Sequence, residues 1–263
     1  MAVPDYWIKL LKETPDEQWD IWQMWNMMTD RLPDVRTVAY CESHDQALVG
    51  DKTLAFRLMD RAMYDSMGLG SQNVVIDRGM ALHKMIRLLT ISTAGQAYLN
   101  FMGNEMGHPE WIDFPREGNG WSYAHARRQW SLASDPKLRY GLLEAFDRAM
   151  IALVRREGVL RDGCPSQLNM DAGNHTMIFA HSDLVFVFNW HPTASIPDYI
   201  LPVKEPGKYL IALDTDAVEF GGQGRNAPSA EHFTFAVAQS DGSVRHYMKI
   251  YNVCRTAIVL RRT

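Results

Sequence analysis

The chain has few cysteines, and they are not arranged as a covalent framework. Its 263 residues contain only Cys41, Cys164 and Cys254, which are widely spaced and form no C-x-x-C motif. An odd number without metal-ligand spacing argues against a set of disulfides and against a zinc knuckle. This pattern favours a reducing compartment, so we expect a cytoplasmic protein.

The sequence also lacks long apolar runs and a surplus of positive charge. Its longest apolar stretches, such as residues 184–188, have the length of a strand and fall far below the roughly 18 residues of a membrane-spanning helix. The first residues carry no export signal. Lysine and arginine number 27 against 31 acidic residues, which gives a net charge of -4. We therefore expect neither a membrane nor a nucleic acid as partner.

The composition is that of a globular protein with a substantial core. Apolar residues make up 46% of the chain and charged residues 22%, close to the averages for folded domains. At about 150 residues per domain, the length corresponds to one large domain or two ordinary ones.

The first half of the chain predicts alternating helices and short strands. Thr14, Pro15 and Glu17 form a helix-start pattern, which predicts a helix over about residues 15–30. Four large residues recur there at every third position, and this spacing favours a buried face over a sugar-stacking platform: Trp19, Trp22, Trp25 and Met28. Helices are also predicted over residues 51–67 and 77–93, each with an N-cap aspartate, and over 137–157; short buried strands are predicted at 38–41 and 97–101.

The second half predicts an antiparallel β-sandwich. From residue 164 onward, strand-length apolar runs are separated by turn residues, and they fall at 177–180, 184–188, 209–213, 233–237, 247–251 and 256–260. The change of period places a boundary near residue 162. We thus expect an α/β domain over residues 1–162 and an all-β domain over residues 163–263.

The densest polar cluster, residues 42–46, follows the predicted strand at 38–41. Glu42, His44 and Asp45 stand there between a strand and a helix, where α/β barrels carry catalytic groups. A second interpretation has equal weight on spacing alone: Glu42, Ser43 and Asp45 cap and solvate a turn.

Other polar or glycine-rich segments favour structural roles. Glu105, His108 and Glu110 lack the helical spacing of a zinc dyad, so no metal site is predicted. Trp111 and Trp121 are expected to pack rather than to stack on sugars. The segment 221–225 (GGQGR) does not open a predicted helix and is interpreted as a flexible turn. The same structural interpretation applies to His175, His181, His191, His232 and His246.

Several longer segments resemble one enzyme family. They are residues 39–52 (AYCESHDQALVGDK), 82–86 (LHKMI), 98–105 (YLNFMGNE), 107–115 (GHPEWIDFP) and 122–130 (SYAHARRQW). Each is similar to a hallmark of the 1,4-α-glucan (glycogen or starch) branching enzymes of the α-amylase superfamily. The likeness extends more loosely into the second half, at residues 206–209 and 213–216.

The resemblance implies the C-terminal part of an α-amylase-type (β/α)8 TIM barrel followed by a β-sandwich. It implies an enzyme without cofactor that cleaves α-1,4-glucan (glycogen, amylose or amylopectin) and transfers the piece to a 6-hydroxyl by a retaining double displacement. Asp45 would take the role of the third, transition-state-stabilising carboxylate, and His44 would hydrogen-bond the substrate beside it.

One departure from the family pattern sets the expected activity of the isolated chain. The motifs that carry the family's nucleophile and acid/base carboxylates are absent from the sequence, and only about two barrel strands precede the sandwich. We therefore expect the C-terminal portion of a branching enzyme, inactive alone and completed by the missing N-terminal part of the barrel. A non-catalytic glucan-binding or assembly module and an α-glucan hydrolase are the alternatives.

Overall fold

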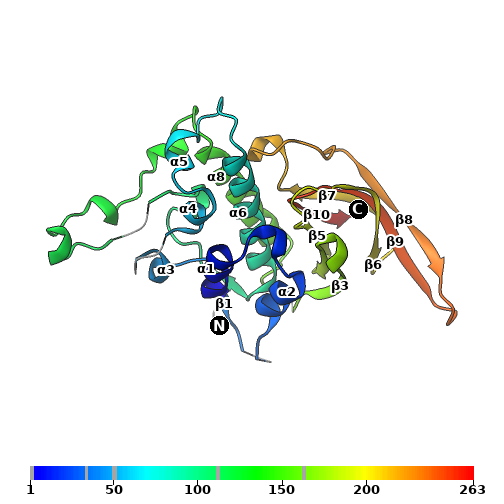
Figure 1. Cartoon of the computed structure of the whole chain (residues 1–263). Coiled ribbons are helices and arrows are strands. Elements are labelled where there is room, and N and C mark those ends of the chain that lie inside the picture. Colours follow the sequence, from blue (N-terminus) through cyan, green and yellow to red (C-terminus); the bar gives the residue numbers. More distant parts are fainter. Residues whose placement is uncertain (1–2, 33–34, 49–51, 111–112, 162–163) are drawn as a thin grey trace.

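The computed structural model describes residues 3–32, 35–48, 52–110, 113–161 and 164–263. A helical part, residues 3–161, lies beside a sheet part, residues 164–263, and a thin arm leaves the helical part on the side away from the sheet (Figure 1). No helix among these residues is long and apolar enough to cross a bilayer. The predicted domain boundary near residue 162 falls on a pair outside the described residues.

The helix predicted over residues 15–30 is divided, and helix α1 before it was not predicted. The structure has helix α1 at Val3–Glu13, a single 3-10 turn η1 at Asp16–Gln18 and helix α2 at Ile21–Thr29. The backbone is extended at Trp19, and Asp20 caps α2 by accepting hydrogen bonds from the amides of Trp22 and Gln23 at 2.8 and 3.2 Å. The prediction of one helix over 15–30 was therefore wrong, because the real cap lies six residues after Thr14.

The tryptophan and methionine stripe packs as the favoured interpretation predicted, with one exception. Trp19, Trp25 and Met28 are buried. The Trp19 ring contacts Trp190, and the Trp25 ring contacts Phe179 of the sheet part. Trp22 is 42% exposed. Most of this stripe thus joins the helical part to the sheet part.

The helical part also contains a short parallel strand pair. Strand β1, Val38–Ala39, pairs in parallel with β2, Ala97–Tyr98, so each predicted strand exists but is only two residues long. The prediction that both are buried was wrong, since Val38 is 57% exposed and Ala97 is also exposed. A Cβ at Gly95 would lie 2.6 Å from the Thr37 carbonyl oxygen, so the close approach of the two segments requires glycine there. The other helices are α3 His44–Leu48, α4 Leu54–Met59, α5 Ala62–Asp65, α6 Val74–Thr93, α7 Ser131–Ser134 and α8 Tyr140–Arg156.

Two other helix predictions need correction at their starts. The helix expected over 51–67 is broken into α4 and α5 at Asp60, whose φ is 46°. Thr53 caps α4, and the proposed cap Asp51 lies outside the described residues. Helix α6 begins three residues earlier than predicted because Asn73, rather than Asp77, accepts the first free amides.

The sheet part is one antiparallel eight-stranded sheet folded into two layers. Its order is β3-β4-β5-β10-β7-β8-β9-β6. A separate apolar cluster joins Ile178 and Val187 of one layer to Leu201 and Ile250 of the other. The strands are β3 Ser166–Asp171, β4 Thr176–His181, β5 Leu184–Asn189, β6 Ile196–Val203, β7 Lys208–Asp214, β8 Glu231–Ala238, β9 Val244–Asn252 and β10 Thr256–Arg262.

The six predicted strands are confirmed, and two more were missed. Strand β3 has a sequence, SQLNMD, in which polar residues predominate. Strand β6, IPDYILPV, contains two prolines, which weaken any strand prediction. Because β3 and β6 are the two ends of the sheet, both sequences occupy edges, where lost ladder bonds and polar side chains are tolerated.

The opposite face of the sheet packs on the helices. Phe179 stacks on Phe186 and Phe188, and Phe188 stacks on Trp190. These rings belong to the same buried cluster as the apolar residues of α2, α6 and α8. The two parts therefore share one hydrophobic core rather than touching through a thin interface.

Candidate functional site

Two polar loops leave the parallel strands at the same end. Because β1 and β2 run in the same direction, the loop after β1, from residue 40, and the loop after β2, from residue 99, begin on one rim. These loops contain both polar clusters that the sequence analysis singled out.

Glu42 and Ser43 organise the first loop from within. The Glu42 carboxylate is buried and accepts a hydrogen bond from the Leu54 amide at 2.5 Å, at the start of α4. Burial raises the pKa of Glu42 to about 7, although the Leu54 amide and the charges of Arg128 and Arg87 favour its charged form. Ser43 accepts a hydrogen bond from the Asp45 amide at 3.2 Å. For Glu42 and Ser43, the turn-building interpretation is confirmed.

His44 and Asp45 differ from those neighbours because their side chains point to solvent. The side chains are 55% and 70% exposed, and His44 Nε2 lies 3.1 Å from Asp45 Oδ1. The His44 ring centroid is 6.5 Å from that of Phe114, on the second loop. The side chains of the two predicted site residues thus lie within ion-pair distance of each other; their catalytic roles remain predictions.

The second polar cluster, around His108, forms a set of buried hydrogen bonds at the base of its loop, which we call the lock. The Gln129 amide donates to His108 Nε2 at 3.1 Å, and Arg128 donates to the carbonyls of Met102 and Glu110, both at 3.0 Å. Burial and the nearby charge of Arg128 lower the pKa of His108 to about 4. His108 therefore acts as a neutral hydrogen-bonding centre that closes the loop between residues 108 and 128.

The lock involves a residue that the sequence analysis noted only as part of the family-like segment 122–130. Arg128 lies 20 residues from His108 in the chain, so no local pattern connects them. The described residues contain no group of three His, Cys, Asp or Glu side chains that could hold a metal ion. Trp111 lies outside the described residues, whereas Trp121 is 66% exposed, so its predicted packing role was wrong.

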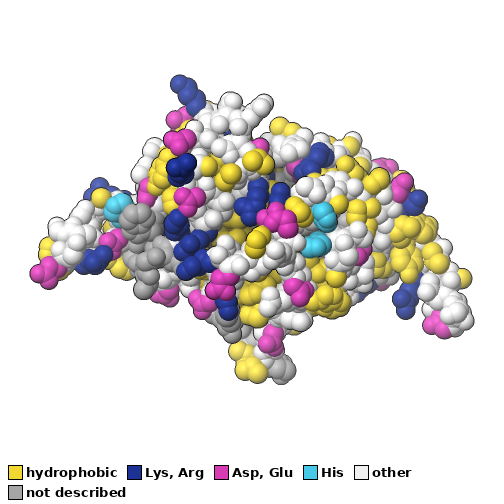
Figure 2. Space-filling view, viewed as in Figure 1, with side chains coloured by type: hydrophobic (Ala, Val, Ile, Leu, Met, Phe, Trp, Pro, Cys, Tyr) yellow, Lys and Arg dark blue, Asp and Glu magenta, His cyan; other side chains and the backbone are white. Residues whose placement is uncertain are grey.

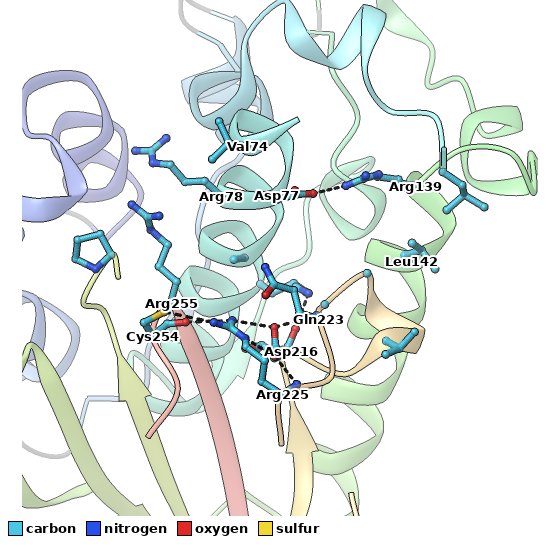
Figure 3. A pocket seen from close by; sticks show the side chains of 18 residues that line it. Val74, Asp77, Arg78, Arg139, Leu142, Asp216, Gln223, Arg225, Cys254 and Arg255 are labelled. Atoms are coloured by element: carbon cyan, nitrogen blue, oxygen red, sulfur yellow. Dashed lines mark hydrogen bonds and ion pairs between the residues drawn. The ribbon is translucent and has the colours of Figure 1, made fainter. Parts of the chain in front are cut away.

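A second polar feature is a cleft of about 510 Å³ between α6 and residues 215–225. Figure 2 shows Lys and Arg side chains gathered over this junction, and Figure 3 shows that most labelled charges have partners within it. Asp16 accepts from Arg78 Nε at 2.9 Å and from Arg255 Nε at 2.9 Å. Burial alone would raise the pKa of Asp16, but these two guanidinium groups hold it below its usual value.

Lys84 and Asp216 complete this junction. Lys84 Nζ donates to the carbonyls of Thr215 and Phe220 at 2.5 and 2.8 Å. Burial lowers the pKa of Lys84 to about 8, against the opposing charges of Asp216 and Asp214. These contacts join helix α6 of the helical part to a loop of the sheet part. The charged residues of the cleft therefore have a structural role.

The glycine-rich segment 221–225 is a well-bonded loop rather than a flexible turn. The amides of Gln223 and Arg225 donate to the Asp216 carboxylate at 3.1 and 3.0 Å, and the Arg225 guanidinium contacts both carboxylate oxygens. The loop therefore binds an anion, as phosphate loops do, but that anion is a side chain of the same molecule.

The sheet part identifies the broad class of protein to which this domain belongs. Residues 168–263 match the family described as alpha amylase, C-terminal all-beta domain. The chain thus contains a domain of the α-amylase class of proteins.

Comparison over the whole chain is more specific. The chain is 51% identical over 235 residues to a 1,4-alpha-glucan-branching enzyme of Solanum tuberosum, which covers 89% of this chain and 27% of that protein. It is 49% identical over 261 residues to the enzyme of the same name from Saccharomyces cerevisiae, covering 99% of this chain and 37% of that protein. The chain belongs to the 1,4-alpha-glucan-branching enzyme family, and it spans about a third of the length of these relatives.

Among solved structures, a debranching enzyme from Nostoc punctiforme aligns with 99% of this chain and 40% of its own, with a TM-score of 0.47 and 15% identity. This weak likeness adds nothing to the assignment.

Proposed function

We propose that the protein carrying this chain forms α-1,6 branches by cutting an α-1,4-glucan and transferring the cut piece to a 6-hydroxyl. The observation that carries the proposal is the exposed His44–Asp45 pair, whose side chains are 3.1 Å apart at the start of α3, after β1, in a chain about half identical to branching enzymes over nearly its whole length. No cofactor is needed for this chemistry.

The proposed architecture assigns residues 1–162 to the end of an α-amylase-type barrel and residues 163–263 to its C-terminal β domain. The parallel pairing of β1 and β2 supports this assignment, as does the connection between them, which contains helix α6. In such a barrel the loops after the strands surround the active site, and the proposal assigns His44 and Asp45 to that rim.

The proposed reaction is a retaining double displacement. A carboxylate attacks the anomeric carbon while an acid protonates the departing glucan oxygen, and a sugar hydroxyl then displaces the enzyme from the glycosyl intermediate. Asp45 would accept hydrogen bonds from hydroxyls of the distorted sugar and strengthen them as positive charge develops. His44 would donate to a neighbouring hydroxyl. The nucleophile and the acid/base would come from a part of the barrel outside this chain.

The test is an Asp45→Asn variant of the intact protein that contains this sequence. Loss of one group that stabilises transition-state charge should lower the branching rate roughly 10²–10³-fold, measured as new α-1,6 linkages in amylose. Asp198→Asn is the matched control, because Asp198 is an exposed aspartate of the sheet part whose side chain is 80% exposed. An Asp45→Asn protein that branches at the normal rate would refute the assignment.

Product analysis separates the proposed reaction from its alternatives. Transfer to sugar creates one α-1,6 linkage for each α-1,4 linkage broken, whereas hydrolysis by water creates reducing ends without branches. Reducing ends alone would identify a glucan hydrolase, and binding without either product would identify a glucan-binding module.

A further inference from the structure

The segment that carries His44 and Asp45 has its two ends joined by one buried hydrogen bond. Glu42 stands two residues before His44, and its carboxylate accepts from the Leu54 amide at 2.5 Å, although the two residues are 12 positions apart. Glu42 is 2% exposed and Leu54 is fully buried. The Glu42 carboxylate therefore fixes the point where the segment leaves β1 relative to the point where α4 begins.

Thr53, directly before Leu54, joins the same segment to the lock. Its hydroxyl accepts from the Phe56 amide at 3.2 Å, as the N-cap of α4, and donates to the His108 carbonyl at 3.1 Å. The His108 ring is itself held by the Gln129 amide. Thr53 thus attaches the end of the first loop to the base of the second.

Arg128 adds an electrostatic link between the lock and Glu42. Its positive charge counteracts the burial that raises the pKa of the Glu42 carboxyl, as expected where a buried charge needs compensation. Glu42, Thr53, His108 and Arg128 are at most 7% exposed. Additional protein around this chain can only add cover to such groups, so the network does not depend on which surfaces are open to water.

Short-range hydrogen bonds make the turn between Glu42 and Asp45 a single unit. The Gln46 side chain accepts from the Ser43 amide at 2.9 Å, and the Ser43 hydroxyl accepts from the Asp45 amide at 3.2 Å. A displacement of Glu42 is therefore transmitted to Asp45, three residues further on, rather than absorbed between them.

We propose that Glu42 and Thr53 are positioning residues for the proposed reaction, which hold Asp45 where it meets the substrate without touching the substrate themselves. A group that stabilises a transition state must be held to within a fraction of an ångström, and a misplacement of about 1 Å can lower a rate by about 10²-fold. Buried hydrogen bonds behind the reacting groups supply this precision. The proposal rests on the proposed function, because that function gives Asp45 its role.

The first experiment compares Glu42→Ala with Glu42→Gln in the intact protein. Alanine removes the acceptor of the Leu54 amide, whereas glutamine keeps an oxygen in its place. We expect Glu42→Ala to lower kcat for branching by roughly 10- to 10²-fold with little change in KM for amylose, and Glu42→Gln to restore most of the rate. A normal kcat for Glu42→Ala would overturn the proposal, and so would equal losses in the two variants.

Thr53 provides a second pair of variants with a matched control. Thr53→Val loses the hydroxyl at nearly the same shape, whereas Thr53→Ser keeps it. Thr256 of β10 is the control, because it is 3% exposed and its hydroxyl also donates to a backbone carbonyl, that of Val253, at 2.8 Å. Thr53→Val and Thr256→Val should both lower the midpoint of urea denaturation, but only Thr53→Val should lower kcat. Equal values of kcat in these two variants would show that the loss of a buried hydroxyl has no special effect at Thr53, and would overturn the proposal.

A double variant separates positioning from a general loss of stability. If Glu42 acts through Asp45, adding Glu42→Ala to Asp45→Asn should lower the rate by less than about threefold, because the group that Glu42 places is already lost. Full multiplication of the two single losses would mean that Glu42 acts elsewhere, which contradicts the proposal.

The products of the parent protein distinguish failure of this proposal from failure of the proposed function. If the parent forms branches and Asp45→Asn does not, a normal rate for Glu42→Ala refutes only the positioning roles. If the parent releases reducing ends without branches, the branching assignment fails, and the same order of rates among the variants, measured on reducing ends, supports the positioning roles. A parent protein that forms neither product overturns both proposals.

Discussion

Helix α6 and strands β4 and β5 are all deeply buried, but their side chains are of different kinds. Strands β4 and β5 are buried at every position, mostly with aromatic and aliphatic residues. Helix α6 instead buries His83, Lys84 and Arg87 near its middle. The sheet part is therefore held mainly by apolar area, whereas the helical part also depends on specific polar partners supplied by distant segments.

The largest expected effect comes from removing one such partner. Arg87 is fully buried and pairs with Asp147 on α8. Asp147→Ala would leave the guanidinium buried without its carboxylate, so we expect the free energy of unfolding to fall by about 3–5 kcal/mol, measured by urea denaturation. The double variant Arg87→Met with Asp147→Leu should recover most of the loss, because it buries no charge. Equal losses in the single and double variants would show that packing, not charge, matters here.

The sheet part should respond to lost volume instead. Leu201 is fully buried between the two layers of the sheet, and Leu201→Ala should cost about 2–5 kcal/mol through lost apolar burial and the cavity left behind. Ile200, the preceding residue on β6, is 50% exposed and provides the control. If Ile200→Ala costs as much as Leu201→Ala in urea denaturation, the two-layer core does not exist in solution.

The stability of the folded protein should depend on pH through Glu42, which lies in the helical part. Burial raises the pKa of Glu42 in the folded protein to about 7, above its usual value of 4.5. Between these values the folded state holds a proton that the unfolded state has lost, so stability decreases as pH rises, by up to about 1.4 kcal/mol per pH unit. Above pH 7 the cost is fully present.

The Glu42→Gln variant tests this linkage. Glutamine keeps an oxygen that can accept from the Leu54 amide but does not titrate, so the contribution of Glu42 to the slope between pH 4.5 and 7 should disappear. Urea denaturation of both proteins at several pH values measures that difference. Identical slopes would mean that Glu42 is solvated in the folded protein.

The sequence predicted best where hydrophobic period alone determines structure. The six apolar runs after residue 164 all form strands, because strand-length apolar runs bounded by turn residues are a local signal that sequence alone carries. Strands β3 and β6 were missed because their places at the sheet edges are fixed by pairing with distant segments rather than by composition.

The candidate site was predictable only in part. The order of strand, polar loop and helix pointed to the segment 42–46, whereas the choice of His44 and Asp45 within it came from the resemblance to branching enzymes. The sequence could not reveal that Arg128 closes the second loop on His108, because these residues are many positions apart. It also could not reveal that a hydrogen-bonded turn exposes Trp121, because that depends on a strained backbone conformation. The contacts of Asp216 were missed for the same reason. The loop that binds it, residues 221–225, resembles a flexible turn when its sequence is considered alone.

The smallest expected effect concerns the start of α2, where two candidate caps can be compared directly. Asp20 accepts hydrogen bonds from two free amides, so Asp20→Ala should cost about 1 kcal/mol in free energy of unfolding. Thr14 precedes the η1 turn, whose N-cap is Pro15 and which has no side-chain cap, so Thr14→Ala should stay within about 0.5 kcal/mol of the parent. Urea denaturation of both variants decides between the two caps. A larger loss of unfolding free energy for Thr14→Ala would support a continuous helix from residue 15. Trp19 would then have to leave the extended conformation in which its ring contacts Trp190.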